Sequence, residues 1–134
     1  MPTVTNANLT LTTVDKNTTI QVTYSANFSA FERRLAKLGL VFRERIRVIG
    51  VDPPGSTTGT VLANFPAVDL PVTDGGTPQT IPRTRSITVS RASLQEDSGL
   101  GDNDEIRCRI RIAALGLPPA ETSDVFTDQE LLVG

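Results

Sequence analysis

The chain has 134 residues, of which 38% are hydrophobic and 21% charged, a composition typical of a folded domain with its own core. Its 13 Lys and Arg against 15 Asp and Glu give a net charge of -2, so there is no global attraction to nucleic acid or to an anionic membrane. It contains no histidine, which removes the commonest general base and metal ligand.

Cys108 is the only cysteine, so no disulfide can form within the chain. The fold must therefore be held by its core alone, which suits a reducing compartment. The first residues show neither the basic segment nor the apolar segment of a secretory signal. No apolar run approaches the roughly 18–20 residues of a membrane span. We expect a protein without membrane insertion that assembles in the cytoplasm.

The N-terminal part alternates apolar and polar residues with a period of two. Residues 8–14 place Leu9 and Leu11 on one face, and residues 19–26 place Ile20, Val22 and Tyr24 on one face. A polar turn separates the two runs. This pattern predicts two half-buried antiparallel strands.

Residues 29–38 break this pattern and predict a short helix. Ser29 lies three residues before Glu32, as in a capping box, and Gly39 stands where a helix would end. Phe31, Leu35 and Leu38 recur at helical spacing. We expect this apolar stripe to cover one end of the strand layers; the alternative is a groove for a partner.

Residues 40–50 predict a third strand with Phe42, Ile46 and Val48 facing inward. Glu44 has the same parity, and an unpaired buried carboxylate is costly. We expect it at a rim or a bulge; pairing with an arginine is the alternative.

The rest of the chain predicts further short strands over residues 60–65, 67–72, 86–90, 105–113 and 123–133, with loops over 52–59 and 73–82. Pro66 and Pro71 confine the first two of these strands to edges or ends. Ile87 and Val89 face inward in the strand over 86–90. About seven or eight short strands predict an all-β fold, an antiparallel β-sandwich.

The C-terminal third adds a resemblance. The corner "SLQEDSG" (residues 93–99) and the strand "IRCRIRIAA" (residues 106–114) are followed by the loop "LGLPPAETSD". This succession resembles the last strands of immunoglobulin-like and fibronectin type III domains, with Ile106 in place of their corner tyrosine. The resemblance implies one domain over residues 1–134, in which the third and sixth strands are antiparallel neighbours.

Two arginine rows would then lie side by side on the outward face of that sheet, where opposed like charges are unfavourable. The positive charges of the two rows can be neutralised by an internal lattice of acidic residues or by an acidic surface of another protein, and the sequence allows both alternatives. The two rows consist of Arg43, Arg45 and Arg47 with Arg107, Arg109 and Arg111. The internal candidates are Asp69, Asp128 and Glu130.

No residue pattern indicates catalysis or a cofactor. Cys108 lies on the apolar side of its strand, and no base stands at motif spacing from a nucleophile, so we expect neither an enzyme nor a small-molecule substrate. The acidic loop offers a weak calcium site at Asp97, Asp102 and Asp104, but its spacing is not that of an EF-hand. Otherwise we expect no metal, and the lack of interleaved aromatics argues against nucleic acid.

We expect a non-enzymatic structural subunit of a homo- or hetero-oligomeric assembly, which docks on other protein subunits through the arginine rows and the terminal strands. By analogy, small disulfide-free sandwiches serve as decoration, collar or adaptor proteins in phage particles and phage-tail-like injection machines. The alternatives are a carbohydrate-binding module, disfavoured by the absence of tryptophan, and a calcium-stiffened adhesin-like domain.

Overall fold

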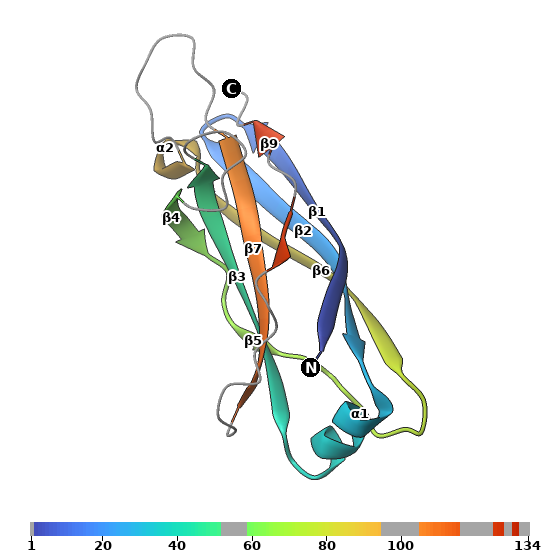
Figure 1. Cartoon of the computed structure of the whole chain (residues 1–134). Coiled ribbons are helices and arrows are strands. Elements are labelled where there is room, and N and C mark those ends of the chain that lie inside the picture. The colour runs from blue at the N-terminus through green and yellow to red at the C-terminus, as the bar shows by residue number, and fades with distance from the viewer. Residues whose placement is uncertain (1, 52–58, 95–104, 116–124, 128–129, 132–134) are drawn as a thin grey trace.

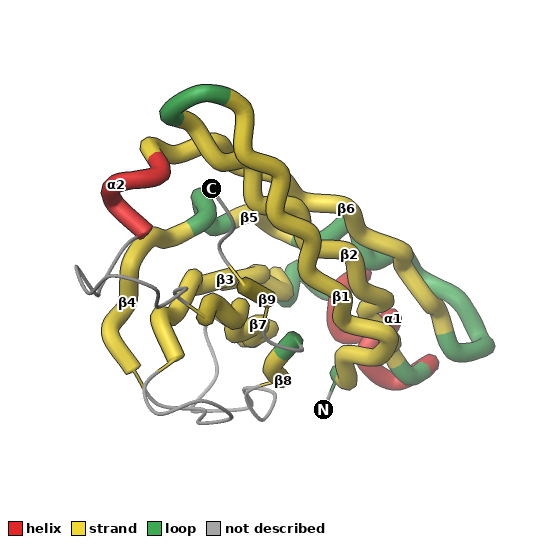
Figure 2. Tube along the Cα trace, turned by 90° about the horizontal axis from the view of Figure 1, so that it is seen from above, coloured by secondary structure: helices red, strands yellow, loops and turns green. Residues whose placement is uncertain are grey.

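Two antiparallel sheets pack face to face as a β-sandwich (Figure 1; Figure 2). The computed structural model describes residues 2–51, 59–94, 105–115, 125–127 and 130–131. One sheet has the strand order β1-β2-β6, and the other has the order β4-β3-β7-β8, in which β5 also pairs with β3 and β9 with β7. The predicted all-β antiparallel sandwich is confirmed. The strands are β1 (Thr3–Val14), β2 (Asn17–Phe28), β3 (Val41–Val51), β4 (Gly59–Asn64), β5 (Val68–Asp69), β6 (Gln79–Ser90), β7 (Glu105–Leu115), β8 (Val125–Phe126) and β9 (Glu130–Leu131).

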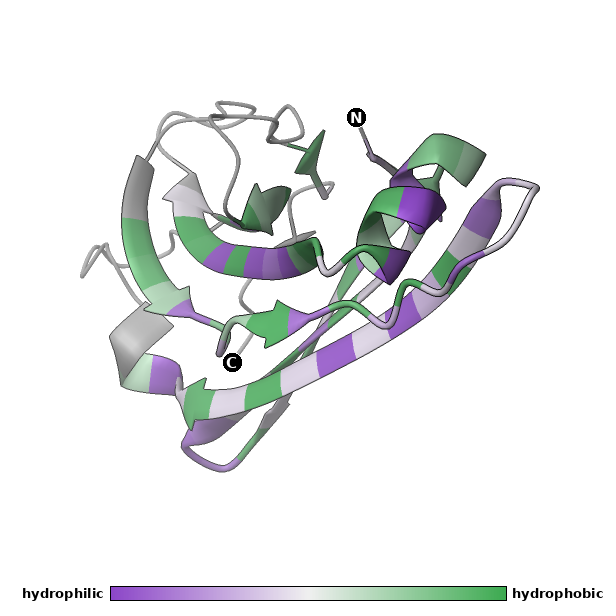
Figure 3. Ribbon diagram, turned by 90° about the horizontal axis from the view of Figure 1, so that it is seen from below, coloured by the Kyte–Doolittle hydropathy of each residue, from purple (hydrophilic) through white to green (hydrophobic). Residues whose placement is uncertain are grey.

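The first sheet follows the alternation of its sequence. Ile20, Val22 and Tyr24 of β2 are buried as predicted, and polar residues occupy the opposite side of the strand. Figure 3 shows hydrophobic positions alternating with polar ones along the strands. This sheet is therefore half buried, with one face toward the core and one toward solvent.

Strand β6 is longer than the sequence predicted. It pairs with the whole of β2, from Asn17 opposite Ser90 to Phe28 opposite Gln79. Residues 79–82, expected in a loop, therefore belong to the strand. Pro82 is tolerated because β6 lies at the end of the order β1-β2-β6, where one side of the strand needs no ladder hydrogen bond.

In the second sheet, β3 and β7 are antiparallel neighbours, as predicted. Their pairing runs from Val41 opposite Leu115 to Gly50 opposite Ile106. The rings of Phe28 and Phe42 pack against each other between the two sheets, with their centroids 5.0 Å apart. The inward residues of β3 and β7 that form the core are Phe42, Ile46, Val48, Ile106, Cys108, Ile110 and Ile112.

The connecting strands are shorter than expected. Strand β5 covers only two residues of the predicted strand over 67–72. The final strand over 123–133 is represented by β8 and β9, and its remaining residues, except Thr127, lie outside the described residues. The corner over 93–99 begins in a short helix, α2 (Arg91–Leu94), and otherwise lies outside them too.

Helix α1 (Ala30–Lys37) has the predicted caps. The Ser29 hydroxyl accepts the Glu32 N–H at 3.1 Å, and the Glu32 carboxylate accepts the Ser29 N–H at 2.8 Å. Gly39 follows the helix with φ of 106°, a conformation that favours glycine. The prediction of a helix with a capping box between β2 and β3 is confirmed.

The predicted orientation of α1 is wrong. Phe31 is 70% exposed and Leu38 is 78% exposed, whereas Glu32 is buried. The helix has only about two turns and lies at one end of the sandwich, between the end of β2 and the start of β3 (Figure 1). The strands that enter and leave it fix its rotation more strongly than its short apolar stripe does.

Candidate functional site

The outward side of β3 and β7 carries the arginine face, which we define as Arg43, Arg45, Arg47, Arg107, Arg109 and Arg111. The register places Arg45 directly opposite Arg111 and Arg47 directly opposite Arg109. At the two ends of the face no arginine lies opposite another, because Arg43 pairs with Ala113 and Arg107 pairs with Ile49.

The four central arginines surround a shallow hollow. Its walls are Arg45, Arg47, Arg109 and Arg111, drawn from both strands. Arg45 and Arg47 are exposed, and Arg109 and Arg111 are half-buried. A hollow ringed by four positive charges attracts anionic groups.

The internal lattice is present at one edge of the face. Arg43 Nε lies 2.9 Å from Asp69 Oδ1, across the β3–β5 pair, as expected for Asp69. The side chains of Arg43 and Asp69 are 37% and 54% exposed, so this pair contributes at most about 1 kcal/mol. Of the other two candidates, Asp128 lies outside the described residues, and only the backbone of Glu130 is described, opposite Ile106.

The β7 row and the β3 row differ in their partners. Arg107 stacks on Phe126, with its guanidinium carbon 6.0 Å from the ring centroid. Arg109 and Arg111 also have contacts of their own. Across the described part of the chain, the side chains of Arg45 and Arg47 have no hydrogen-bond acceptor or carboxylate partner. The lattice therefore covers the face only in part.

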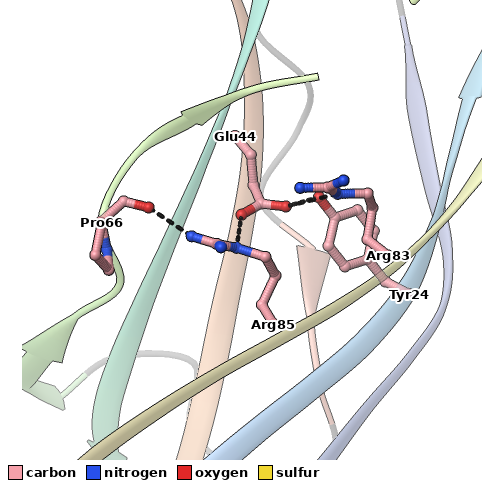
Figure 4. A network of polar contacts seen from close by, with 5 residues as sticks. All are labelled: Tyr24, Glu44, Pro66, Arg83 and Arg85. Carbon is pink, nitrogen blue, oxygen red and sulfur yellow. Dashed lines mark hydrogen bonds and ion pairs between the residues drawn. The ribbon is translucent and has the colours of Figure 1, made fainter. Parts of the chain in front are cut away.

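Glu44 is fully buried, so the expectation of a rim or bulge is wrong and the arginine-pairing alternative is correct (Figure 4). Arg85 Nε donates to Glu44 Oε1 at 2.7 Å, and Arg83 Nε lies 3.7 Å from Glu44 Oε2. The Tyr24 hydroxyl donates to the same carboxylate. Because these partners come from the opposite sheet, the buried charge joins the two layers.

This network, composed of Tyr24, Glu44, Arg83 and Arg85, is held at its edge by the backbone. Arg85 Nη2 donates to the carbonyl of Pro66 at 2.8 Å. Burial, followed by the hydrogen bond to Glu44, raises the pKa of Tyr24 well above its usual value, so this hydroxyl remains a donor. Arg83 and Arg85 have the same parity as the inward-facing Ile87, and this was the signal in the sequence that they point toward the core. This signal was missed because the strand was expected to begin at Ser86.

Cys108 lies in the core, as expected from its parity. Burial raises the pKa of its thiol to about 12, so it carries no thiolate at neutral pH. Its backbone N–H donates to the hydroxyl of buried Thr127 at 2.9 Å, and Thr127 N–H donates to its carbonyl at 3.0 Å. This geometry suits structure, not nucleophilic chemistry.

The described residues give no support to the other ligand classes. They contain no cluster of three or more His, Cys, Asp or Glu side chains suited to a metal. The calcium candidates Asp97, Asp102 and Asp104 lie outside them. Tyr24, the only tyrosine, is buried and offers no platform for a sugar. None of the helices that can be described has the length and apolar character to cross a bilayer.

A second hollow lies beside α1. It is lined by Ala30, Phe31 and Arg34 of the helix and by Gly75 and Gly76 of the loop before β6. Phe31 therefore contributes to an open surface instead of the core.

Comparison with known proteins gives no relative from which a function could be inferred. No family model matches the chain, and neither the curated proteins nor the solved structures contain a match.

Proposed function

We propose that this protein is a non-enzymatic structural subunit that docks on an acidic surface of another protein through its arginine face. The observation that carries the proposal is the register, which sets Arg45 against Arg111 and Arg47 against Arg109 around one hollow. Carboxylates of a partner would replace the repulsion within these two pairs by attraction.

Arginine suits such a role better than lysine would. Its planar guanidinium binds carboxylates in a bidentate manner and is weakly hydrated, so it tolerates burial at an interface. The exposed Arg45 and Arg47 lack acceptors within the described residues, so a partner would not have to break an existing ion pair of theirs. The edge pair Arg43–Asp69 would then fix the rim of the docking surface.

Membership of the immunoglobulin-like or fibronectin type III group is part of the proposal. It is supported by the arrangement of β1, β2 and β6 in one sheet with β3 beside β7 in the other. A role as a decoration, collar or adaptor subunit of a phage particle or injection machine follows from analogy with such sandwiches. It implies assembly in the cytoplasm.

The test compares partner recovery by the wild-type protein and by Arg45→Glu/Arg47→Glu from lysate of the native host, with quantitative mass spectrometry. The matched control is Lys16→Glu/Arg34→Glu, which changes the net charge equally at exposed positions away from the face. We expect one acidic protein to be recovered by the wild type and the control and to be lost at least tenfold from the arginine variant.

Circular dichroism of the three proteins must show the same fold. The proposal fails if the arginine variant recovers the same proteins as the wild type, or if the control loses them to the same extent. A monomeric wild-type protein that recovers no partner also contradicts it.

A further inference from the structure

The outward face of the sheet β1-β2-β6 carries no charge. The register aligns its outward-facing positions in six rows of three residues, one from each strand. All these positions lie in the described residues, and apart from Val14 and Pro82 every one is Thr, Ser, Asn or Gln. We call this surface the neutral face. Its two central rows are Thr10–Gln21–Ser86 and Asn8–Thr23–Thr84.

The absence of charge from this face is unusual for this chain. Charged residues make up 21% of the sequence, and exposed positions normally carry most of them. Depletion of charged residues is a compositional signal of the central part of a protein interface. Thr, Ser and Asn also lose less rotamer entropy than lysine or glutamate when they are immobilised.

Most side chains of the central rows are available for new hydrogen bonds, the exception being Asn8, whose amide donates to the carbonyl of Asn6 at 3.2 Å. Nearer the ends of the face, hydroxyls and amides bond across strands, as in Thr19 with Thr88 at 3.0 Å and Thr80 with Asn27 at 2.9 Å. Gln21 and Thr23 have no such partner among the described residues. Hydroxyl and amide groups both donate and accept, so this surface can pair with a surface of its own kind.

The shape of the face selects the kind of partner. Its strands are long and twisted (Figure 1), and adjacent strands of a sheet rotate by roughly 20–25°. A flat or straight partner would touch only part of such a surface. A second twisted sheet follows the same curvature, and two sheets pack face to face at about 30° for this reason.

The area is sufficient for a weak dimer. At about 3.3 Å per residue and about 4.8 Å between strands, three strands of 12 residues cover roughly 40 by 14 Å. This corresponds to roughly 500 Å² per copy and about 1,000 Å² in total, the lower limit for a specific interface.

We infer that the neutral face binds a second copy of this chain, back to back, in a symmetric dimer. This arrangement places the two arginine faces on opposite outer sides of the dimer, because each belongs to the other sheet of its sandwich. The inference does not depend on what the arginine face binds.

The experiment is sedimentation equilibrium of the full chain from micromolar to millimolar concentration. We expect the wild-type mass to rise from one to two copies over this range. Gln21→Lys/Thr23→Lys places like charges near the two-fold axis and should weaken dimerisation at least tenfold, as should Gln21→Glu/Thr23→Glu. An equimolar mixture of the two variants should dimerise again through opposite charges.

Ala67→Lys/Thr77→Lys is the matched control, since it adds two charges at exposed positions outside this sheet and should dimerise like the wild type. Thermal melting verifies that each variant is folded. The inference is overturned if the wild type stays monomeric, if the Lys variant dimerises as the wild type does, or if the mixture remains monomeric. Arg45→Glu/Arg47→Glu should still dimerise, which separates this result from the fate of the proposed function.

Discussion

At the scale of single residues, Glu44 has the largest consequence for the molecule. Its side chain is fully buried, whereas the side chains of Arg83 and Arg85 are 23% and 19% exposed. Removing one partner from a buried ion pair leaves an uncompensated charge, which is costly. The intact ion pair contributes only modestly to the free energy of folding, because the charged groups lose their hydration on burial. The network therefore specifies how the two sheets face each other more than it adds net stability.

Glu44→Ala should lower the free energy of unfolding by roughly 3–5 kcal/mol, because it leaves two largely buried guanidinium groups without a carboxylate. Urea denaturation measures this loss. The control Asp69→Ala removes an exposed pair and should cost less than about 1 kcal/mol. Equal losses in the two variants would contradict the structural role of the buried network.

The pKa of Cys108 predicts a loss of stability at high pH. The folded thiol keeps its proton up to a pKa of about 12, whereas the unfolded thiol releases its proton near its ordinary pKa of 9.0. Rising pH therefore favours the unfolded state above about pH 9, and the raised pKa of Tyr24 acts in the same direction.

We expect the unfolding free energy of the wild type to fall steadily from pH 9 upward. Cys108→Ala should be less stable at pH 7 because of the cavity, but its stability should fall less steeply between pH 9 and 11. Parallel pH profiles of the two proteins would show that the thiol does not titrate differently on folding. Thiol labelling at pH 8 should be slow unless denaturant is added.

At the scale of elements, α1 is tied by polar contacts to the loop before β6. Its Arg33 lies inside the loop before β6 and donates to the carbonyls of Thr73 at 2.7 Å, Thr77 at 2.8 Å and Asp74 at 2.9 Å. Lys37 adds an ion pair with Asp74. The helix therefore organises a loop distant in sequence, which the polar composition of residues 73–77 did not reveal.

Gly75→Ala should destabilise the protein by about 1–2 kcal/mol, because its new methyl group would lie 2.3 Å from the Arg33 guanidinium carbon and displace it from its acceptors. Gly76→Ala is the matched control, since nothing lies within 4 Å of its added methyl group, and should be nearly neutral.

A double-mutant cycle with Arg33→Ala gives the decisive comparison. If displacement of the Arg33 guanidinium causes the loss of stability, Gly75→Ala should lower the unfolding free energy much less in a protein that already carries Arg33→Ala. Full additivity of the two substitutions would place the cause elsewhere.

At the scale of the whole molecule, the two outer faces of the sandwich are opposite in character. The face of β3 and β7 is rich in arginine, whereas the face of β1, β2 and β6 is neutral. Associations through these two surfaces should therefore respond differently to ionic strength, because screening acts on exposed charges and not on neutral contacts.

Raising sodium chloride from about 50 mM to 500 mM should weaken binding of a short poly-glutamate peptide to the protein by tenfold or more, as the screening length falls from about 14 Å to about 4 Å. Self-association through the neutral face should change less than about twofold. Isothermal titration calorimetry measures the first effect and sedimentation the second. Peptide binding that is insensitive to salt would mean that the arginine face does not provide its affinity.

The sequence by itself determined the sandwich, the short capped helix and the outward direction of each arginine row. The pairing of the two rows was implied by the resemblance to immunoglobulin-like and fibronectin type III domains. The strands and the helix follow from local rules, namely alternation with a period of two and a capping box whose two residues lie three positions apart. Because the apolar residues of β3 and β7 occupy the core side, Arg45 and Arg109 must face outward. The parity of each strand was therefore sufficient to predict which side its arginines face, whereas the resemblance supplied the neighbour relation that the register of β3 and β7 shows.

Only the tertiary structure decided where Glu44 and Phe31 lie. Burial of Glu44 depends on Arg83 and Arg85, 39 and more positions away in the chain, meeting it across the two sheets. Exposure of Phe31 depends on how two strands orient the helix between them. The neutral face could be recognised only from the register of β1, β2 and β6, because it is formed by polar residues of three strands and not by any single segment.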